Sequence, residues 1–159
     1  MPLAAACGGG GDGEEVSLED YLGQVEAVLQ ESDRRFADLE AEGLAAEEIQ
    51  TPAEAVALEE RARDIIGDAL GELRGLDAPA EAQREHEELV VAANNYVHEL
   101  DAFIGRLRNA QTAEDVRALF DGIPGSPLDE AAQRLDTSCF QLQDLAEARA
   151  VEVDLSCGE

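Results

Sequence analysis

Three cysteines are the residues of this sequence whose surroundings point most directly to chemistry. Cys7 follows the short apolar run Leu3-Ala4-Ala5-Ala6 and precedes four consecutive glycines. A small residue at the end of an apolar leader is typical of the site where a signal peptide is removed, and a cysteine directly after it is then the residue that is acylated. We therefore interpret Cys7 as a lipid-attachment site and residues 1–6 as a signal-peptide remnant. The alternative is an Ala/Gly-rich start with an incidental cysteine.

If Cys7 carries lipid, Cys139 and Cys157 remain as a pair, in an export compartment where disulfides persist. From Cys139 the last helix rises about 15 Å to its end, and an extended tail returning at about 3.3 Å per residue reaches back past Cys139. The spacing therefore permits a disulfide between Cys139 and Cys157, which would stabilise the fold by about 3 kcal/mol. The alternative is two free, buried thiols.

The two histidines are the natural candidates for a metal site inside a helical bundle. Di-iron bundles use Glu-x-x-His on two helices, but Gln83 precedes His86 by three positions and Asn95 precedes His98 by three. His86 lies on an apolar helical stripe, which favours a core histidine over a ligand. Paired carboxylates are too frequent to mark a site. We expect no catalytic residue, no metal and no cofactor, so the protein is predicted not to be an enzyme.

Three glycines, Gly67, Gly71 and Gly75, recur at a spacing of four in the second predicted helix. Each interior glycine destabilises a helix by about 1 kcal/mol relative to alanine. The row indicates either a smooth groove where another helix or a ligand approaches the backbone, or tolerated sequence drift.

The composition restricts the partners. Among 159 residues there are 37 Asp and Glu against 11 basic residues, all arginine, giving a formal net charge of −26. A polyanion such as nucleic acid would be repelled, and so would an anionic membrane surface. The acidity reflects salt adaptation or solubility, with a functional acidic surface as the alternative. No run of about twenty apolar residues that could span a membrane occurs.

Capping residues and prolines in the sequence predict where the helices that position these residues begin. Ser17 with Asp20, and Thr51 with Glu54, form capping boxes, and Pro52 fits the first helical position. Ser126-Pro127-Leu128-Asp129 repeats that formula and begins the last long helix, whose inward-facing residues are predicted to be Leu128, Ala132, Leu135, Cys139, Leu142 and Leu145. Thr112 with Asp115 begins a short helix through Phe120. The third long helix is predicted to begin at Asp77-Ala78-Pro79. Its apolar stripe is Ala82, His86, Leu89, Ala93, Tyr96, Leu100, Phe103 and Leu107.

Four amphipathic helices joined by short turns predict an all-α, antiparallel four-helix bundle over residues 17–159, preceded by a flexible Gly/acidic linker at 7–16. The short helix would cover one end. After Arg149 the apolar period changes to two, in Val151, Val153 and Leu155, which predicts an extended tail lying along the helices.

The two ends of the chain also carry a resemblance. Cys139-Phe140-Gln141-Leu142-Gln143 and the terminal Val153-Asp154-Leu155-Ser156-Cys157 resemble the end of uncharacterised, Ala/Glu-rich helical lipoproteins of GC-rich bacteria. Those proteins begin with a lipidated cysteine and a Gly/acidic linker. The resemblance implies a helical fold in the cell envelope and implies no activity.

From these observations we expect a lipid-anchored, extracytoplasmic helical bundle, held to the membrane through Cys7, that serves as a structural or binding module. The alternative is an extracytoplasmic small-molecule or cation-binding sensor domain.

Overall fold

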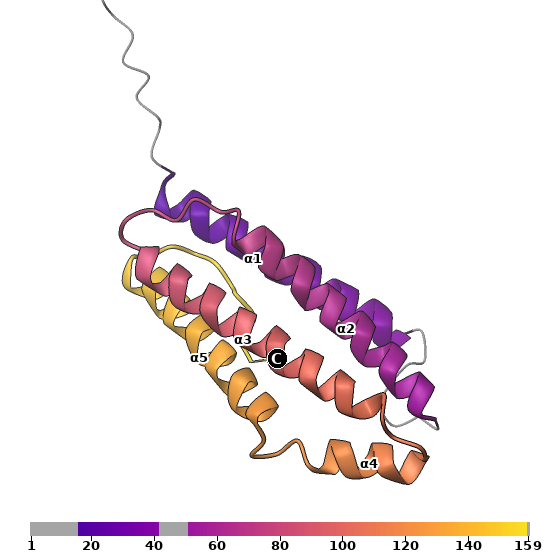
Figure 1. Cartoon of the computed structure of the whole chain (residues 1–159). Coiled ribbons are helices and arrows are strands. Elements are labelled where there is room, and N and C mark those ends of the chain that lie inside the picture. The colour runs from indigo at the N-terminus through magenta and orange to yellow at the C-terminus, as the bar shows by residue number, and fades with distance from the viewer. Residues whose placement is uncertain (1–15, 42–50, 159) are drawn as a thin grey trace, which may run out of the picture.

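A computed structural model describes residues 16–41 and 51–158, and the described part contains five helices. These are α1 (Leu18–Ala41), α2 (Pro52–Leu73), α3 (Gln83–Leu107), α4 (Ala113–Asp121) and α5 (Pro127–Ala148). The four long helices run antiparallel to their neighbours, and α4 crosses one end of them (Figure 1). The predicted antiparallel helical bundle with one short extra helix is confirmed.

The helices pack in the order α1, α2, α3, α5, with the most extensive contact between α3 and α5. The fourth side of the bundle, between α1 and α5, is occupied by the C-terminal tail, drawn in yellow in Figure 1. We call this space the α1/α5 seam. Its apolar walls are Tyr21, Leu22 and Val25 of α1 and Cys139, Leu142 and Ala146 of α5.

Most helix starts lie where local capping chemistry predicts them. Thr51 and Thr112 each form a complete capping box, with Glu54 and Asp115 respectively. The Ser126 hydroxyl accepts a hydrogen bond from Asp129 N, and the Ser17 hydroxyl accepts one from Asp20 N at 3.1 Å. These side chains satisfy backbone N–H groups that have no partner within the first turn.

The predicted start of the third helix at Asp77-Ala78-Pro79 is wrong, because α3 begins at Gln83. Pro79 instead begins a turn in which Ala82 N donates to Pro79 O at 2.9 Å. Leu76 and Ala78 pack against the bundle core, so the connection crosses the end of the bundle in an irregular conformation. Burial of these apolar side chains outweighs the helical signal that the proline gives.

The core is divided along the bundle. One apolar cluster surrounds the α1/α5 seam, a second gathers α2, α3 and α4 residues at the opposite end, and a small third lies between α1 and α2. At the α4 end the rings of Phe103 and Phe120 meet edge to face, with centroids 5.3 Å apart. Near the start of α5, Ala131 is buried, whereas Ala132, which the sequence predicts to face inward, is only partly buried.

The end of α5 gives a stability prediction. Ala150 has φ of 57°, and Val151 N donates to Ala146 O at 2.9 Å, the hydrogen bond of a helix C-terminus that favours glycine. Ala150→Gly should therefore raise the free energy of unfolding by about 1 kcal/mol, because it removes a left-handed alanine. Urea titration measures the change.

The matched control is Ala102→Gly on the exposed face of α3, which should lower the free energy of unfolding by about 1 kcal/mol. Destabilisation by both glycines would contradict the conformation assigned to Ala150.

Candidate functional site

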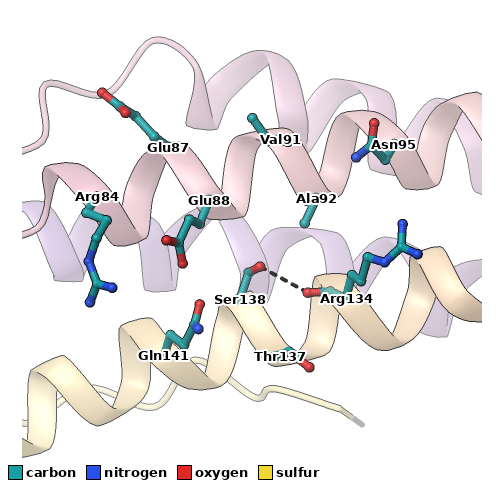
Figure 2. A pocket seen from close by; sticks show the side chains of 10 residues that line it. All are labelled: Arg84, Glu87, Glu88, Val91, Ala92, Asn95, Arg134, Thr137, Ser138 and Gln141. Carbon is teal, nitrogen blue, oxygen red and sulfur yellow. Dashed lines mark hydrogen bonds between the residues drawn. The ribbon is translucent and has the colours of Figure 1, made fainter.

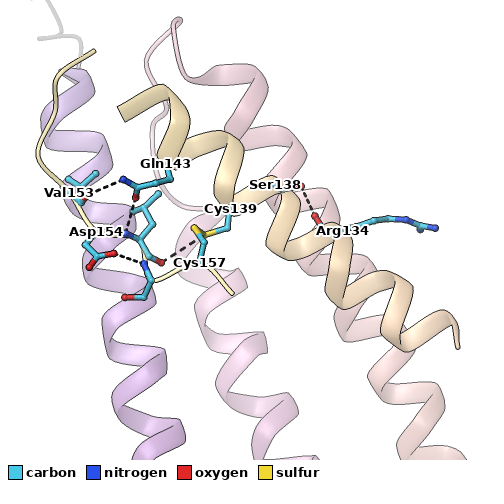
Figure 3. Close-up of a disulfide and its surroundings, with 9 residues drawn as sticks. Arg134, Ser138, Cys139, Gln143, Val153, Asp154 and Cys157 are labelled. Atoms are coloured by element: carbon cyan, nitrogen blue, oxygen red, sulfur yellow. Dashed lines mark hydrogen bonds between the residues drawn. A yellow bond between two sulfur atoms is a disulfide. The ribbon is translucent and has the colours of Figure 1, made fainter. Parts of the chain in front are cut away.

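The C-terminal tail is fixed in the α1/α5 seam by the pair that the sequence singled out. The Sγ atoms of Cys139 and Cys157 are 1.98 Å apart, at disulfide distance, and their Cα atoms are 5.7 Å apart (Figure 3). Val151, Val153 and Leu155 turn toward the core as the period of two predicts, and Leu155 is buried within it. The tail therefore completes the core at the place where α1 and α5 make little contact with each other.

Polar contacts hold the backbone of the tail on both walls of the seam. The Gln143 side chain of α5 donates from Nε2 to Val153 O at 3.2 Å and accepts from Leu155 N at 3.1 Å. On the other wall, Asp154 N donates to the Glu26 carboxylate of α1 at 2.9 Å. An extended segment without sheet partners needs such bonds, because buried backbone groups without a partner are costly. Neither Gln143 nor Glu26 is marked as a tail contact by any pattern in the sequence.

A polar pair joins α1 to α3 inside the same core. The Tyr21 hydroxyl lies 3.0 Å from His86 Nδ1, and the two rings meet edge to face with centroids 5.7 Å apart. Tyr21 is completely buried and His86 nearly so. The prediction that His86 is a core residue agrees with this position, whereas Tyr21 was missed, although it lies three residues after Leu18 and four before Val25.

Burial controls the ionisation of this pair. It raises the pKa of Tyr21 above the usual value, and the Glu85 carboxylate adds to the rise. Burial also lowers the pKa of His86, with the Glu87 carboxylate opposing the shift. Both rings are therefore uncharged at neutral pH, and the hydrogen bond joins two neutral groups inside the core.

A groove runs along the outside of the bundle between α3 and α5, with a cavity volume of about 540 Å³. We call it the α3/α5 groove, and Figure 2 shows it from close by. Its lining residues come from these two helices alone: Arg84, Glu87, Glu88, Val91, Ala92, Asn95, Arg134, Thr137, Ser138 and Gln141.

The hydroxyl groups on the floor of the groove already donate hydrogen bonds within the protein. Ala92 points toward α5, and the Ser138 hydroxyl of α5 donates to a carbonyl of its own helix (Figure 2). Thr137 Oγ1 donates to Gln133 O at 2.7 Å, and Ser138 Oγ donates to Arg134 O at 3.0 Å. The floor is thus small, internally satisfied and largely apolar in what it presents to a ligand.

The remaining candidate residues are not brought together. Cys7 lies outside the described residues, and His98 is exposed on α3, away from the Tyr21–His86 pair. Within residues 16–41 and 51–158, no group of three or more His, Cys, Asp or Glu residues is placed to hold a metal ion. No helix of these two ranges is long and apolar enough to cross a membrane.

The glycine row on α2 has no close neighbour from another helix. A Cβ at Gly71 would meet no atom within 4 Å, and one at Gly67 would meet only the Arg63 guanidinium at 3.6 Å. A Cβ at Gly75 would meet carbonyl oxygens of its own helix end. No other described helix therefore approaches this row.

The disulfide predicts a large effect on stability. Cys139→Ser with Cys157→Ser should lower the free energy of unfolding by about 3 kcal/mol, because the unfolded chain regains the freedom of the closed loop. Urea titration measures it, and the reduced wild type should match the double variant. Cys7→Ser is the control. Equal stability of oxidised and reduced protein would contradict the role assigned to the pair.

The Tyr21–His86 pair predicts a pH dependence. Because the folded pKa of His86 is lowered, the unfolded chain binds a proton more readily, and stability is lost as the pH falls through about 6.5. Wild type should therefore lose stability relative to His86→Gln between about pH 7 and pH 5. His98→Gln, on the exposed face of α3, is the matched control.

Urea titrations at several pH values measure the difference between wild type and His86→Gln, in which the other titrating groups cancel. A difference that stays constant across this range would show that His86 is accommodated equally well in its charged form.

Comparison with known protein families, with curated proteins and with solved structures finds no match to this chain.

Proposed function

We propose that this chain is the helical body of a lipid-anchored, extracytoplasmic protein that acts as a structural or binding module of the cell envelope and not as an enzyme. The observation that carries the proposal is the Cys139 and Cys157 pair at disulfide distance. Such a bond persists in oxidising compartments and is rare among cytosolic proteins. With these two cysteines paired, Cys7 is left for lipid attachment through the context described above.

The arrangement of the polar side chains supports binding over catalysis. The nearly buried histidine, His86, pairs with Tyr21 in the core and does not line the α3/α5 groove. The groove hydroxyls of Thr137 and Ser138 donate to backbone carbonyls. A nucleophile needs a base within hydrogen-bond reach, and these hydroxyls are engaged with their own helix instead.

The alternative, an extracytoplasmic small-molecule or cation-binding sensor domain, is favoured by the groove volume of about 540 Å³. Small-ligand sites, however, bury roughly 70–90% of their ligand and fix it with a few converging polar groups. The α3/α5 groove lies on the outer surface between two helices, and the hydroxyls of Thr137 and Ser138 donate to carbonyls of their own helix. This geometry is better suited to a long partner surface than to an enclosed small molecule.

The anchor is tested by growing the native cells with a radioactive fatty acid and isolating the protein expressed from its own gene. We expect the wild type to carry label and to fractionate with membranes, whereas Cys7→Ala takes up none because the acylated thiol is gone. Cys139→Ser with Cys157→Ser is the control that should retain the label. An unlabelled wild-type protein would end the proposal of a lipid anchor.

A further inference from the structure

The charged side chains around the α3/α5 groove are only partly neutralised by ion pairs. The two arginines at its ends are each paired within their own helix, Arg84 with Glu85 and Arg134 with Glu130. Glu87 accepts a hydrogen bond from the neutral Gln83 side chain at 2.7 Å. Among the described residues, no arginine forms an ion pair with Glu87 or Glu88. These two carboxylates remain available to a cation from outside.

An exposed apolar side chain lies next to these carboxylates. Val91 is 59% exposed, and within the described residues it and Phe140 are the large hydrophobic side chains that are left in water. Val91 follows Glu87 by one helical turn and lines the groove, with Ala92 beside it on the floor. A ligand that matches this surface must place apolar groups over Val91 and Ala92 and positive charge beside Glu87 and Glu88.

The length and depth of the groove suit a helix. Arg84 and Asn95 mark its extent on α3, about 16 Å along the helix axis. The small side chains of Ala92 and Ser138 on the floor allow a third helix to approach closely, since interaxial distances depend on the side chains at the contact. Amphipathic helices that lay an apolar face in such a groove are a recurring mode of peptide recognition.

We propose that the α3/α5 groove docks a basic amphipathic helix of a protein partner. The inference rests on the proposed binding-module function and names the partner class. Charge decides between possible occupants: a second copy of this chain would also carry a net charge of −26 and would be repelled, as would an anionic lipid surface. A cationic helix is attracted at long range by the negative charge of the bundle, and apolar contact with the floor of the groove then stabilises the bound helix.

The test uses the full chain, with Cys139 and Cys157 oxidised, and a synthetic amphipathic helix of about 18 leucine and lysine residues, long enough to be helical on binding. A scrambled peptide of equal composition controls for charge alone. Binding is followed by NMR shift mapping and by titration at two salt concentrations. We expect saturable binding of the amphipathic peptide, with shifts concentrated at the groove, and weaker binding of the scrambled peptide.

Two pairs of matched variants locate the site. Val91→Arg should weaken binding about tenfold, whereas Phe140→Arg, which also replaces an exposed large apolar side chain outside the groove, should change it less than about twofold. Glu87→Gln with Glu88→Gln should weaken binding about threefold at low salt. The same charge change at exposed Glu19 and Glu72 should have a smaller effect.

Three results would overturn the proposal. Equal weakening by both arginine variants, or shifts spread over all acidic faces, would show general electrostatic adsorption. Saturable binding of both peptides at another face would agree with a binding-module function but would contradict docking in the α3/α5 groove. A simple alkylammonium ion that occupies the groove as tightly as the peptide would assign it to a small ligand. None of these results bears on fatty-acid labelling of Cys7, so failure of the groove is distinguishable from failure of the anchor.

Discussion

The bundle depends on the C-terminal tail in the α1/α5 seam. α1 packs mainly against α2 and makes little contact with α5, and its apolar residues Leu22 and Val25 share one core cluster with Leu155 of the tail. Leu155 is buried in this cluster, and burying such a side chain stabilises the fold by about 1.5–3 kcal/mol. Because a lone extended segment has no sheet to join, the bond from Cys157 to Cys139 and the two hydrogen bonds of Gln143 fix its register.

Features governed by local chemistry could be predicted from the sequence. The starts at Thr51, Thr112 and Ser126 depend on side chains that bond backbone groups three residues away. The meeting of Cys139 with Cys157 depends on the fixed rise of a helix and of an extended chain, so their separation in sequence sufficed. The prediction of where α3 begins was wrong because the local helix signals there compete with burial of Leu76 and Ala78 against the rest of the bundle.

The candidate sites could not be predicted because they depend on how each helix is rotated about its axis. A stripe of spacing three and four fixes that rotation only to within about one residue. In α5 this uncertainty separates Ala132, which we expected inside, from Ala131, which is buried. The same uncertainty concealed the contact between Tyr21 and His86 and the facing of Ala92 toward Ser138, since each joins residues of different helices.

In the described part of the chain, the few arginines neutralise carboxylates at some helix junctions and leave those of the α3/α5 groove without an ion pair. Arg35 pairs with Asp68 across α1 and α2, while Arg63 and Arg108 pair with Asp101 and Glu60 across α2 and α3. At the junction of α3 and α5, Arg149 just past the end of α5 pairs with Glu81 just before α3, at the end of the bundle. Among the described residues, no arginine pairs with Glu87 or Glu88 in the groove itself. Exposed ion pairs add little stability, so their main effect is to neutralise carboxylates locally. The unneutralised carboxylates therefore lie beside exposed Val91, where a cationic partner would meet apolar surface and negative charge together.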